Sequence, residues 1–238
     1  MAPTRTSQAS LGSSSETPLE IHKSGARRRL SPSDREKSIA SAAVVFFAEH
    51  GFEGQTRELA ATMGITQPLL YRYFPSKEAL IERVYQEVFV GRWDPFWEEL
   101  IADRAIALEE RLIRFYQSYA SVILTREWVR LFMFSGLKGL DFNGRYLKML
   151  RGRIFERIID ELRFAFHRPS IHEIPASDIE IEMIWAVHAS IFYLGVRQFI
   201  YEMPLTSSIN DILSAKITTL IVGISPVLPA QAVAHGSH

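Results

Sequence analysis

The sequence contains no cysteine and carries no net charge, because 27 lysine and arginine residues balance 27 aspartate and glutamate residues. Without cysteine there can be no disulfide, thiolate metal site, iron–sulfur cluster or cysteine nucleophile. A secreted domain stabilised by disulfides is therefore excluded, and the composition fits a reducing cytoplasm. The balanced charge argues against a surface that binds polyanions everywhere, although it allows a local basic face.

Long apolar runs are also lacking. The longest charge-free apolar run, 183–196, is well short of the ~20 residues needed to cross a bilayer. The N-terminus has no apolar segment of the kind found in a secretory signal. We therefore expect a buried helix at 183–196, a protein that does not bind membranes, and a cytoplasmic location.

Patterns that carry enzymatic chemistry are missing as well. His167 and His172 are separated by Pro169, which breaks the helix that would align them as metal ligands. Glu180 and Glu182 are two positions apart and diverge around a helix. The glycines form no phosphate-binding pattern. We expect no catalytic residue, no metal and no cofactor, and hence no enzyme.

Local signals predict an all-α protein with short helices first and longer ones later. The first predicted helix has a capping box at Ser33–Glu36 and ends near Gly51, and the second runs from Thr56 to about Met63 and is ended by Gly64. The third is capped by Thr66 and has Pro68 in its first turn. The fourth is capped by Ser76 after the break at Pro75. The predicted parts of the chain are a disordered tail at 1–32 with the basic triplet Arg27–Arg29, a compact domain at 33–78 whose fourth helix continues to about 91, a longer helical domain at 79–225, and a second disordered tail at 226–238. We assign no function to the final Gly236–His238.

The longer helices indicate a homodimer. They are expected near 106–124, 126–138, 143–166, 177–202 and 208–224. The capping box Ser177–Glu180 opens a helix that is apolar almost all round, and the last helix carries a narrow apolar stripe. One small chain would not readily cover both helices, so we expect them to pack against a second copy, with burial inside one chain as the alternative. The predicted interface residues are Ile191, Ile209, Ile212, Leu213, Ile217, Leu220 and Ile221.

The segment 56–77 has the residue types of a helix-turn-helix, in which the second helix enters the DNA major groove. Gln67 can pair with adenine, and Arg72 can reach guanine or phosphate. Pro68 and Leu69 can pack on a thymine methyl group. On spacing alone, a generic helical hairpin remains the alternative.

Phosphate contacts are expected beside these base contacts. Thr66 begins the second helix of the motif, and Tyr71 and Tyr73 offer hydroxyl groups to phosphate oxygens. Lys77 lies at the first position of the fourth helix, where free amides and the helix dipole favour an anion.

The stretch FFAEHGFEGQTRELAATMGITQPLLYRYFPSKEALIERVY resembles the N-terminal domain of the tetracycline-repressor (TetR) family of transcriptional regulators. The resemblance covers about residues 33–90. It implies a helix-turn-helix DNA-binding domain at 33–78, followed by a helical effector-binding and dimerisation domain. It also implies double-stranded DNA with a palindromic operator and a small-molecule effector as partners of a homodimer.

The resemblance assigns roles to single residues. The Gln-Pro-x-Leu-Tyr run of the founding member is matched by Gln67, Pro68, Leu70 and Tyr71, which implies that Gln67 and Pro68 face bases. Arg57 matches an arginine that contacts guanine in that protein.

Other positions support or modify this assignment. Tyr71 and Lys77 match the usual phosphate contacts. Leu69 replaces a small residue, and the link from Gly51 to Arg57 is one residue shorter than in many members. The Arg27–Arg29 triplet becomes a candidate arm for the minor groove.

Aromatic residues are dense in the C-terminal helices. Together they suit an apolar cavity with polar points such as Tyr119, His188 or Arg130, although core packing is the alternative for each residue separately. The resemblance implies that such a cavity holds an effector, and we expect an apolar or aromatic one. The predicted effector-binding residues are Tyr119, Trp128, Phe132, Tyr146, Trp185, His188 and Phe192.

These inferences predict a homodimeric repressor that a small effector releases from its operator. Two alternatives stay open. One is an activator with the same fold, and the other is a helical small-molecule-binding protein with a vestigial DNA-binding domain.

Overall fold

The computed structural model describes residues 31–230, and this part of the chain folds into helices without strands. The elements are α1 Pro32–His50, α2 Thr56–Thr62, α3 Gln67–Tyr73, α4 Lys77–Tyr85, η1 Gln86–Val90, α5 Phe96–Ala102, α6 Leu108–Ile123, α7 Arg126–Lys138, α8 Phe142–Leu150, η2 Arg151–Phe155, α9 Glu156–Ala165, α10 Asp178–Phe199 and α11 Ile209–Gly223, where η1 and η2 are π-helical turns. Arg27–Arg29 and Gly236–His238 lie outside the described residues.

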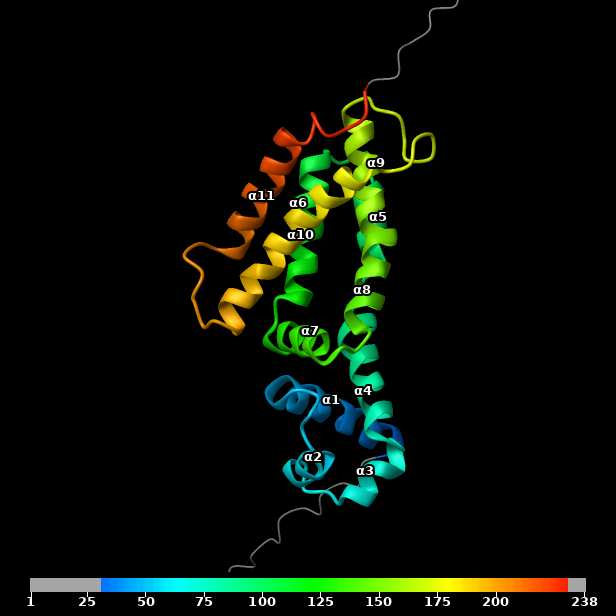
Figure 1. The fold of residues 1–238 in the computed structure, drawn as a ribbon, viewed down its shortest axis with the longest axis vertical. Coiled ribbons are helices and arrows are strands. Elements are labelled where there is room, and N and C mark those ends of the chain that lie inside the picture. Colours follow the sequence, from blue (N-terminus) through cyan, green and yellow to red (C-terminus); the bar gives the residue numbers. More distant parts are fainter. Residues whose placement is uncertain (1–30, 231–238) are drawn as a thin grey trace, which may run out of the picture.

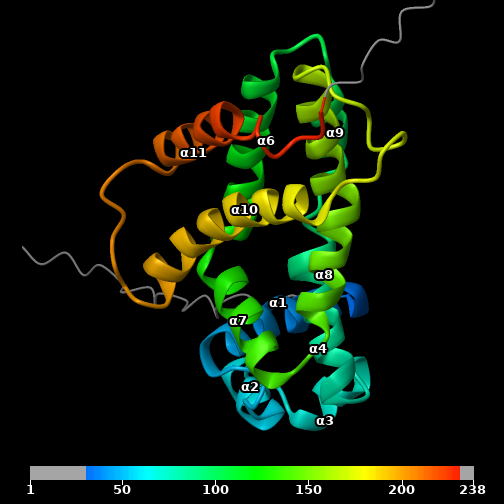
Figure 2. The ribbon, with the colours of Figure 1, turned by 45° about the horizontal axis from the view of Figure 1, so that its top comes forward.

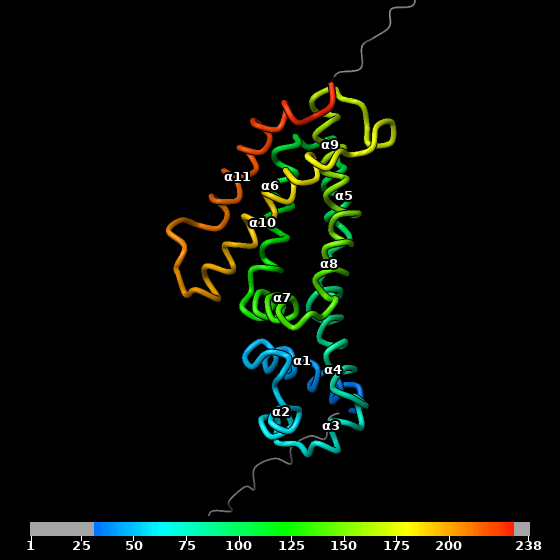
Figure 3. Tube along the Cα trace, in the orientation of Figure 1, coloured from blue at the N-terminus to red at the C-terminus, as the bar shows by residue number. Residues whose placement is uncertain are grey.

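The molecule is elongated, with α1–α3 at one end and the remaining helices forming a larger body (Figure 1). Helix α4 runs from that end into the body, and the Cα trace shows it as the main connection between the two parts (Figure 3). Helix α7 lies directly above α1 in the view of Figure 1, and α10 crosses in front of α6 when the molecule is turned (Figure 2). We call α1–α3 and the start of α4 the N-terminal domain.

The first helix starts two residues earlier than predicted. The hydroxyl of Ser31, not that of Ser33, accepts the backbone N–H of Asp34 at 3.1 Å. Pro32 begins the helix, because its fixed φ suits the first turn and no hydrogen bond is lost there. Glu36 is not part of a capping box and instead pairs with Arg83 of α4 at 3.2 Å. The predicted capping box at Ser33 is therefore wrong.

The turn between α2 and α3 follows the sequence signals closely. Gly64 has a φ of +64°, which favours glycine and ends α2. The hydroxyl of Thr66 then accepts the N–H of Leu69 at 3.3 Å and caps α3. Ser76 caps α4 in the same way through the N–H of Ala79, at 3.1 Å. The predicted caps at Thr66 and Ser76 are confirmed.

The body contains the five predicted longer helical segments and one helix that was not assigned. The segment expected at 143–166 is formed by α8, η2 and α9 in succession. The unassigned helix is α5, Phe96–Ala102, which buries Trp97 and Ile101 against α6 and α9. It is too short to show a clear apolar period.

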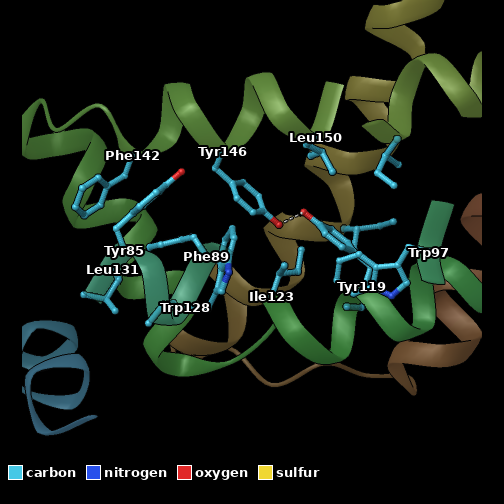
Figure 4. Close-up of a cluster of buried hydrophobic side chains, with 14 of the residues drawn as sticks. Tyr85, Phe89, Trp97, Tyr119, Ile123, Trp128, Leu131, Phe142, Tyr146 and Leu150 are labelled. Carbon is cyan, nitrogen blue, oxygen red and sulfur yellow. Dashed lines mark hydrogen bonds between the residues drawn. The ribbon is translucent and has the colours of Figure 1, made fainter. Parts of the chain in front are cut away.

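Aromatic rings join the two parts of the molecule in one continuous core (Figure 4). Phe52 of the N-terminal domain lies 5.8 Å, centroid to centroid, from Phe142 of α8. Phe142 contacts Tyr85 at 4.7 Å, and Tyr85 contacts Phe89 at 5.6 Å. Phe89 then meets Trp128 of α7 at 5.0 Å. The N-terminal domain is therefore packed against the body and not merely tethered to it.

Helix α10 is the one described helix with the length and apolar composition of a membrane-spanning segment. The run within it, 183–196, was predicted to be a buried helix. The helix packs against α6, α7, α9 and α11, as a core helix does. The predicted capping box is present, with Ser177 and Glu180 bonded to each other's backbone amides.

A buried ion pair fixes the start of α10. Arg163 of α9 donates two hydrogen bonds of 2.7 Å to the Glu180 carboxylate, and both side chains are 1% exposed. Arg163 also donates to the carbonyl groups of Pro169, Ser170, Ile174 and Pro175 in the loop between α9 and α10. This side chain therefore satisfies polar groups of the loop and of the helix it leads into.

Candidate nucleic-acid interface and effector cluster

The predicted DNA-contacting residues lie together on the start of α2, along α3 and at the start of α4, at the end of the molecule remote from α11 (Figure 1). The exposed ones are Arg57, Thr66, Pro68 and Arg72, and the half-buried ones are Gln67, Leu69, Tyr71, Tyr73 and Lys77. Leu59, Ala60 and Leu70 are buried beneath them and pack α2 against α3. The surface therefore presents polar and basic side chains on a fixed apolar base.

Thr56 organises this surface, although it was not among the predicted site residues. Its hydroxyl is hydrogen-bonded to the hydroxyl of Tyr71 at 2.9 Å and accepts an N–H of Gln67 at 3.1 Å. Thr56 is only 5% exposed, so these bonds are shielded from water. The first residue of α2 thus orients two candidate DNA contacts of α3. The sequence signal that could have identified Thr56 is a threonine at the first position of α2, where its hydroxyl does not act as the N-cap.

The start of α4 already holds a carboxylate. The pKa of Glu78 is lowered by a hydrogen bond from its own backbone amide and then by one from the Ser76 hydroxyl. A phosphate bound beside Lys77 would therefore have to share the free N–H groups of this helix end with Glu78.

The predicted effector-binding residues come from α6, α7, α8 and α10 and form one connected group of rings, which we call the aromatic cluster: Tyr119, Trp128, Phe132, Tyr146, Trp185, His188 and Phe192. Trp128 stacks on Phe132 at 4.8 Å and lies 5.4 Å from Tyr146. The hydroxyls of Tyr146 and Tyr119 are hydrogen-bonded at 2.9 Å (Figure 4). Residues distant in the sequence are thus neighbours in the fold.

His188 extends the aromatic cluster and is uncharged. Its ring lies 5.4 Å from Tyr119 and 5.9 Å from Trp185. Burial lowers the pKa of His188 to about 4, so the imidazole is neutral at pH 7. Burial also raises the pKa of Tyr119 and of Tyr146, so both phenols stay protonated. The interior of the cluster is therefore polar in places but carries no charge.

Arg130 does not lie in this cluster, contrary to the suggestion that it supplies a polar point of a cavity. Its guanidinium donates to the carbonyl oxygens of Ala48 and Glu49 at the end of α1. Those carbonyls are among the last of the helix and have no partner within it, so an arginine satisfies them well. Arg126 adds an ion pair to the Glu49 side chain at 2.7 Å.

Helix α7 contacts three parts of the molecule through consecutive residues. Trp128 belongs to the aromatic cluster, and Arg130 binds the end of α1. Val129, between them, packs on α10 so closely that a Cβ added to Gly195 would lie 2.7 Å from its Cγ2 atom. Since neighbouring helical residues point about 100° apart, one turn of α7 joins the cluster, α10 and the N-terminal domain.

The predicted dimer residues divide between the two sides of α10 and α11. Ile191, Leu213 and Ile217 are completely buried inside the chain, and Leu220 is 4% exposed. Ile209, Ile212 and Ile221 are half-buried. The apolar stripe of α11 packs on α6 of the same chain, which a period in the sequence cannot distinguish from packing on a second copy. Ile191, Leu213 and Ile217 have no exposed surface in the single chain, whereas Leu220 borders the groove described next.

The other side of these helices has an open apolar groove of about 610 Å³. Its lining residues are Met183, Ala186, Val187 and Ser190 of α10 and Ile212, Ala215, Lys216, Thr219, Leu220 and Gly223 of α11. Ile179, Tyr193 and Val222 on the same helices are 57%, 50% and 78% exposed. Exposed apolar side chains at this density mark an interaction surface.

Comparison with known proteins agrees with this architecture. The family described as bacterial regulatory proteins, tetR family, matches residues 39–84, which span most of α1 through α4. The tetracycline repressor protein class D of Escherichia coli is 29% identical over 87 residues, covering 33% of this chain and 40% of that protein. The chain thus matches less than half the length of this curated relative.

Solved structures share the whole fold. A TetR-like transcriptional regulator from Rhodococcus sp. RHA1 aligns with a TM-score of 0.60 and 20% identity, over 82% of this chain and 100% of that chain. The fatty acid degradation regulator FadR from Bacillus halodurans aligns with a TM-score of 0.58 and 16% identity, over 83% and 99% of the two chains. The N-terminal domain of this chain thus matches the tetR family of bacterial regulatory proteins over residues 39–84, and the described chain has the fold of these solved regulators.

Proposed function

We propose that this protein is a homodimeric, sequence-specific DNA-binding transcriptional repressor that a small apolar or aromatic effector releases from a palindromic operator. The observation that carries the proposal is the exposed start of α3, where Gln67 is oriented by Thr56 and Pro68 lies beside it. An exposed helix of this kind fits the major groove. A soluble DNA-binding protein of this type would act in the cytoplasm.

The side chains divide into two roles. Gln67, Pro68, Leu69 and Arg57 would contact base edges, where a good bidentate pair contributes about 1–3 kcal/mol of discrimination. Thr66, Tyr71, Arg72, Tyr73 and Lys77 would contact phosphates, which give affinity that depends on salt but not on sequence. Because Gln67 donates to Thr56 without DNA, pairing with adenine would require it to exchange that bond for one to the base.

The apolar groove between α10 and α11 is the proposed dimer interface. The patch that contains Met183, Val187 and Ile212 would pack on the same patch of a second copy, as a two-fold interface requires. The buried Ile191, Leu213 and Ile217 would support the interface from behind. Two copies joined in this way would present two α3 helices to the two half-sites of a palindrome.

The aromatic cluster is the proposed effector site, and α7 is the proposed connection to DNA. An effector that separated Trp128 from its neighbours would displace Arg130, two residues further along α7. Since Arg130 binds the end of α1, the N-terminal domain would move with it. Release requires that the effector bind the displaced state better than the DNA-bound state.

The experiment is selection of bound duplexes from a random pool by the purified full-length protein, followed by sequencing. We expect an enriched palindrome that is lost for Gln67→Ala, while Lys77→Ala weakens all duplexes about equally. Gln86→Ala, on the exposed side of η1, is the matched control and should keep the palindrome. If the pool shows no enrichment although the protein is folded and dimeric, the proposal is wrong.

A further inference from the structure

The aromatic cluster contains buried hydrogen-bonding groups that have no partner in the described part of the chain. They are the indole N–H of Trp128, Nδ1 of His188 and the hydroxyl of Tyr116, a neighbour of the cluster on α6. The three residues are 2%, 6% and 0% exposed. Buried polar groups are nearly always paired, so three unpaired groups in one region indicate a missing partner.

These groups surround a single feature, the hydrogen-bonded pair of Tyr119 and Tyr146 (Figure 4). The ring of His188 lies 5.4 Å from Tyr119, and the ring of Tyr116 lies 6.5 Å from it. The ring of Trp128 lies 5.4 Å from Tyr146. The rings that carry the unpaired groups are therefore neighbours of the Tyr119–Tyr146 pair.

The pair itself has one proton to spare. Two tyrosine hydroxyls carry two protons, but Tyr119 and Tyr146 share one hydrogen bond and make no other within residues 31–230. Whichever tyrosine accepts that bond is left with a proton that has no acceptor. The indole N–H of Trp128 can only donate, and the Tyr116 hydroxyl can donate as well. The region thus offers three unpaired donors, and the neutral His188 ring offers Nδ1 as an acceptor when its proton is on Nε2.

This region also has no charge that could balance a charged ligand. Among the described residues, no ion pair and no hydrogen bond brings an acidic or basic side chain to Tyr116, Tyr119, Trp128, Tyr146 or His188. An ion placed there would lose its hydration without gaining a counter-ion.

We propose that the effector is a neutral molecule with an aromatic or alicyclic frame and one or more hydrogen-bond acceptors, such as carbonyl or ether oxygens. Trp128, Tyr116 and the Tyr119–Tyr146 pair donate to these oxygens. The inference rests on the proposed role of the aromatic cluster as the effector site and narrows the chemistry of that site. Hydrocarbons lack the acceptors, and carboxylates carry a charge that the site does not balance.

Matched probes test this chemistry on the full-length protein without DNA. The probes are two ketones, acetophenone and benzophenone, their hydrocarbon counterparts ethylbenzene and diphenylmethane, and the acid 4-benzoylbenzoate. We expect calorimetry to show at least one ketone binding about tenfold more tightly than its hydrocarbon, which is the effect of about one good hydrogen bond. Benzophenone, activated by light, should form adducts with peptides of α6, α7, α8 or α10.

The Tyr116→Phe variant separates a ligand-binding role from a structural role. It removes one unpaired hydroxyl and keeps the ring, so the unliganded protein should unfold at the same temperature or higher. Ketone binding should weaken about threefold to tenfold, and hydrocarbon binding should not change. Tyr201→Phe, which removes an exposed hydroxyl just after α10, is the matched control and should change neither. Trp128→Phe is a second variant with the same expected loss.

Three results would overturn the inference. The first is equal binding of the ketones and their hydrocarbons, and the second is tightest binding by the acid. The third is that no ketone binds up to its solubility limit and that Tyr116→Phe lowers the unfolding temperature. In that case the Tyr116 hydroxyl would be paired with a buried water. If the proposed function is wrong, the results differ in another way. The ketones would still bind as expected, but DNA binding would be absent or would not change when a ketone is added.

Discussion

The two ends of the molecule hold their candidate functional groups in opposite ways. In the N-terminal domain, Arg57 and Arg72 lie on the surface, and the caps and turns that position them are close in sequence. In the aromatic cluster, the groups are buried and come from helices far apart in the chain, as Tyr119 and Tyr146 do. Substitutions at the DNA-binding surface should therefore mainly change DNA affinity, whereas substitutions in the body should mainly change the unfolding free energy.

The largest expected effect is that of Arg163→Met. The substitution leaves the Glu180 carboxylate buried without its partner, which typically costs about 3–5 kcal/mol of unfolding free energy. Urea denaturation measures it. Arg151→Met is the control, because the Arg151 side chain is 49% exposed, and it should lose less than about 1 kcal/mol. A loss as small as the control's would contradict the importance given to this ion pair.

Acid should destabilise the body through His188, by an amount on the order of 3 kcal/mol. The folded pKa of His188 is lowered to about 4 by burial, from an ordinary value of 6.5. Between these pH values the unfolded chain binds a proton that the folded chain does not. The contribution of neutral His188 to the unfolding free energy is therefore fully present above pH 6.5 and is lost as the pH falls toward 4. The measurement is the unfolding free energy against pH for wild type and His188→Leu. Their difference should depend on pH in this window, and the exposed His172→Leu should follow the wild type.

Arg130→Met should affect both ends of the molecule, because Arg130 belongs to the body but binds the end of α1 in the N-terminal domain. We expect a stability loss of about 1–2 kcal/mol from the two lost hydrogen bonds to α1. The operator found by selection should then tolerate altered spacing of its half-sites, since the N-terminal domain is less firmly placed. Arg126→Met removes only an exposed ion pair and should do neither. Unchanged spacing preference for Arg130→Met would show that aromatic packing alone places the domain.

The smallest expected effect is that of Thr56→Val, which keeps the shape of the side chain. Losing the bonds to Tyr71 and Gln67 should cost about 1 kcal/mol of stability. Competition binding should show a larger loss on the operator than on random duplex, because Gln67 is no longer oriented. Thr62→Val, on the exposed side of α2, is the control. Equal losses on both kinds of DNA would mean that Gln67 does not depend on Thr56.

Features set by neighbours in the sequence were predictable. Gly64, Thr66 and Ser76 end or begin helices through bonds to residues within a few positions, so the helix-turn-helix followed from local signals. The exception is α1, where Ser31 and Ser33 are both suitable caps and the position of Pro32 decides between them.

Features set by distant contacts were predictable only in part. The apolar stripe of α11 was identified, but its period does not say whether Leu213 packs on the same chain or on a second copy. The place of Arg130 depends on how α7 is rotated against α1, which no local pattern encodes. The grouping of Tyr119 with His188 was expected because large aromatic side chains gather in cores.

The single turn of α7 that joins Trp128, Val129 and Arg130 has an evolutionary consequence. A substitution at any of these residues would disturb a partner on a different face of the helix, so each is constrained by the other two. If the aromatic cluster is the effector site, relatives with other effectors should therefore differ at Trp185 and Phe192, the members of the cluster that lie on α10 and not on the helix that binds α1. Selection for a new effector should accordingly yield changes on α10 more often than in this turn of α7.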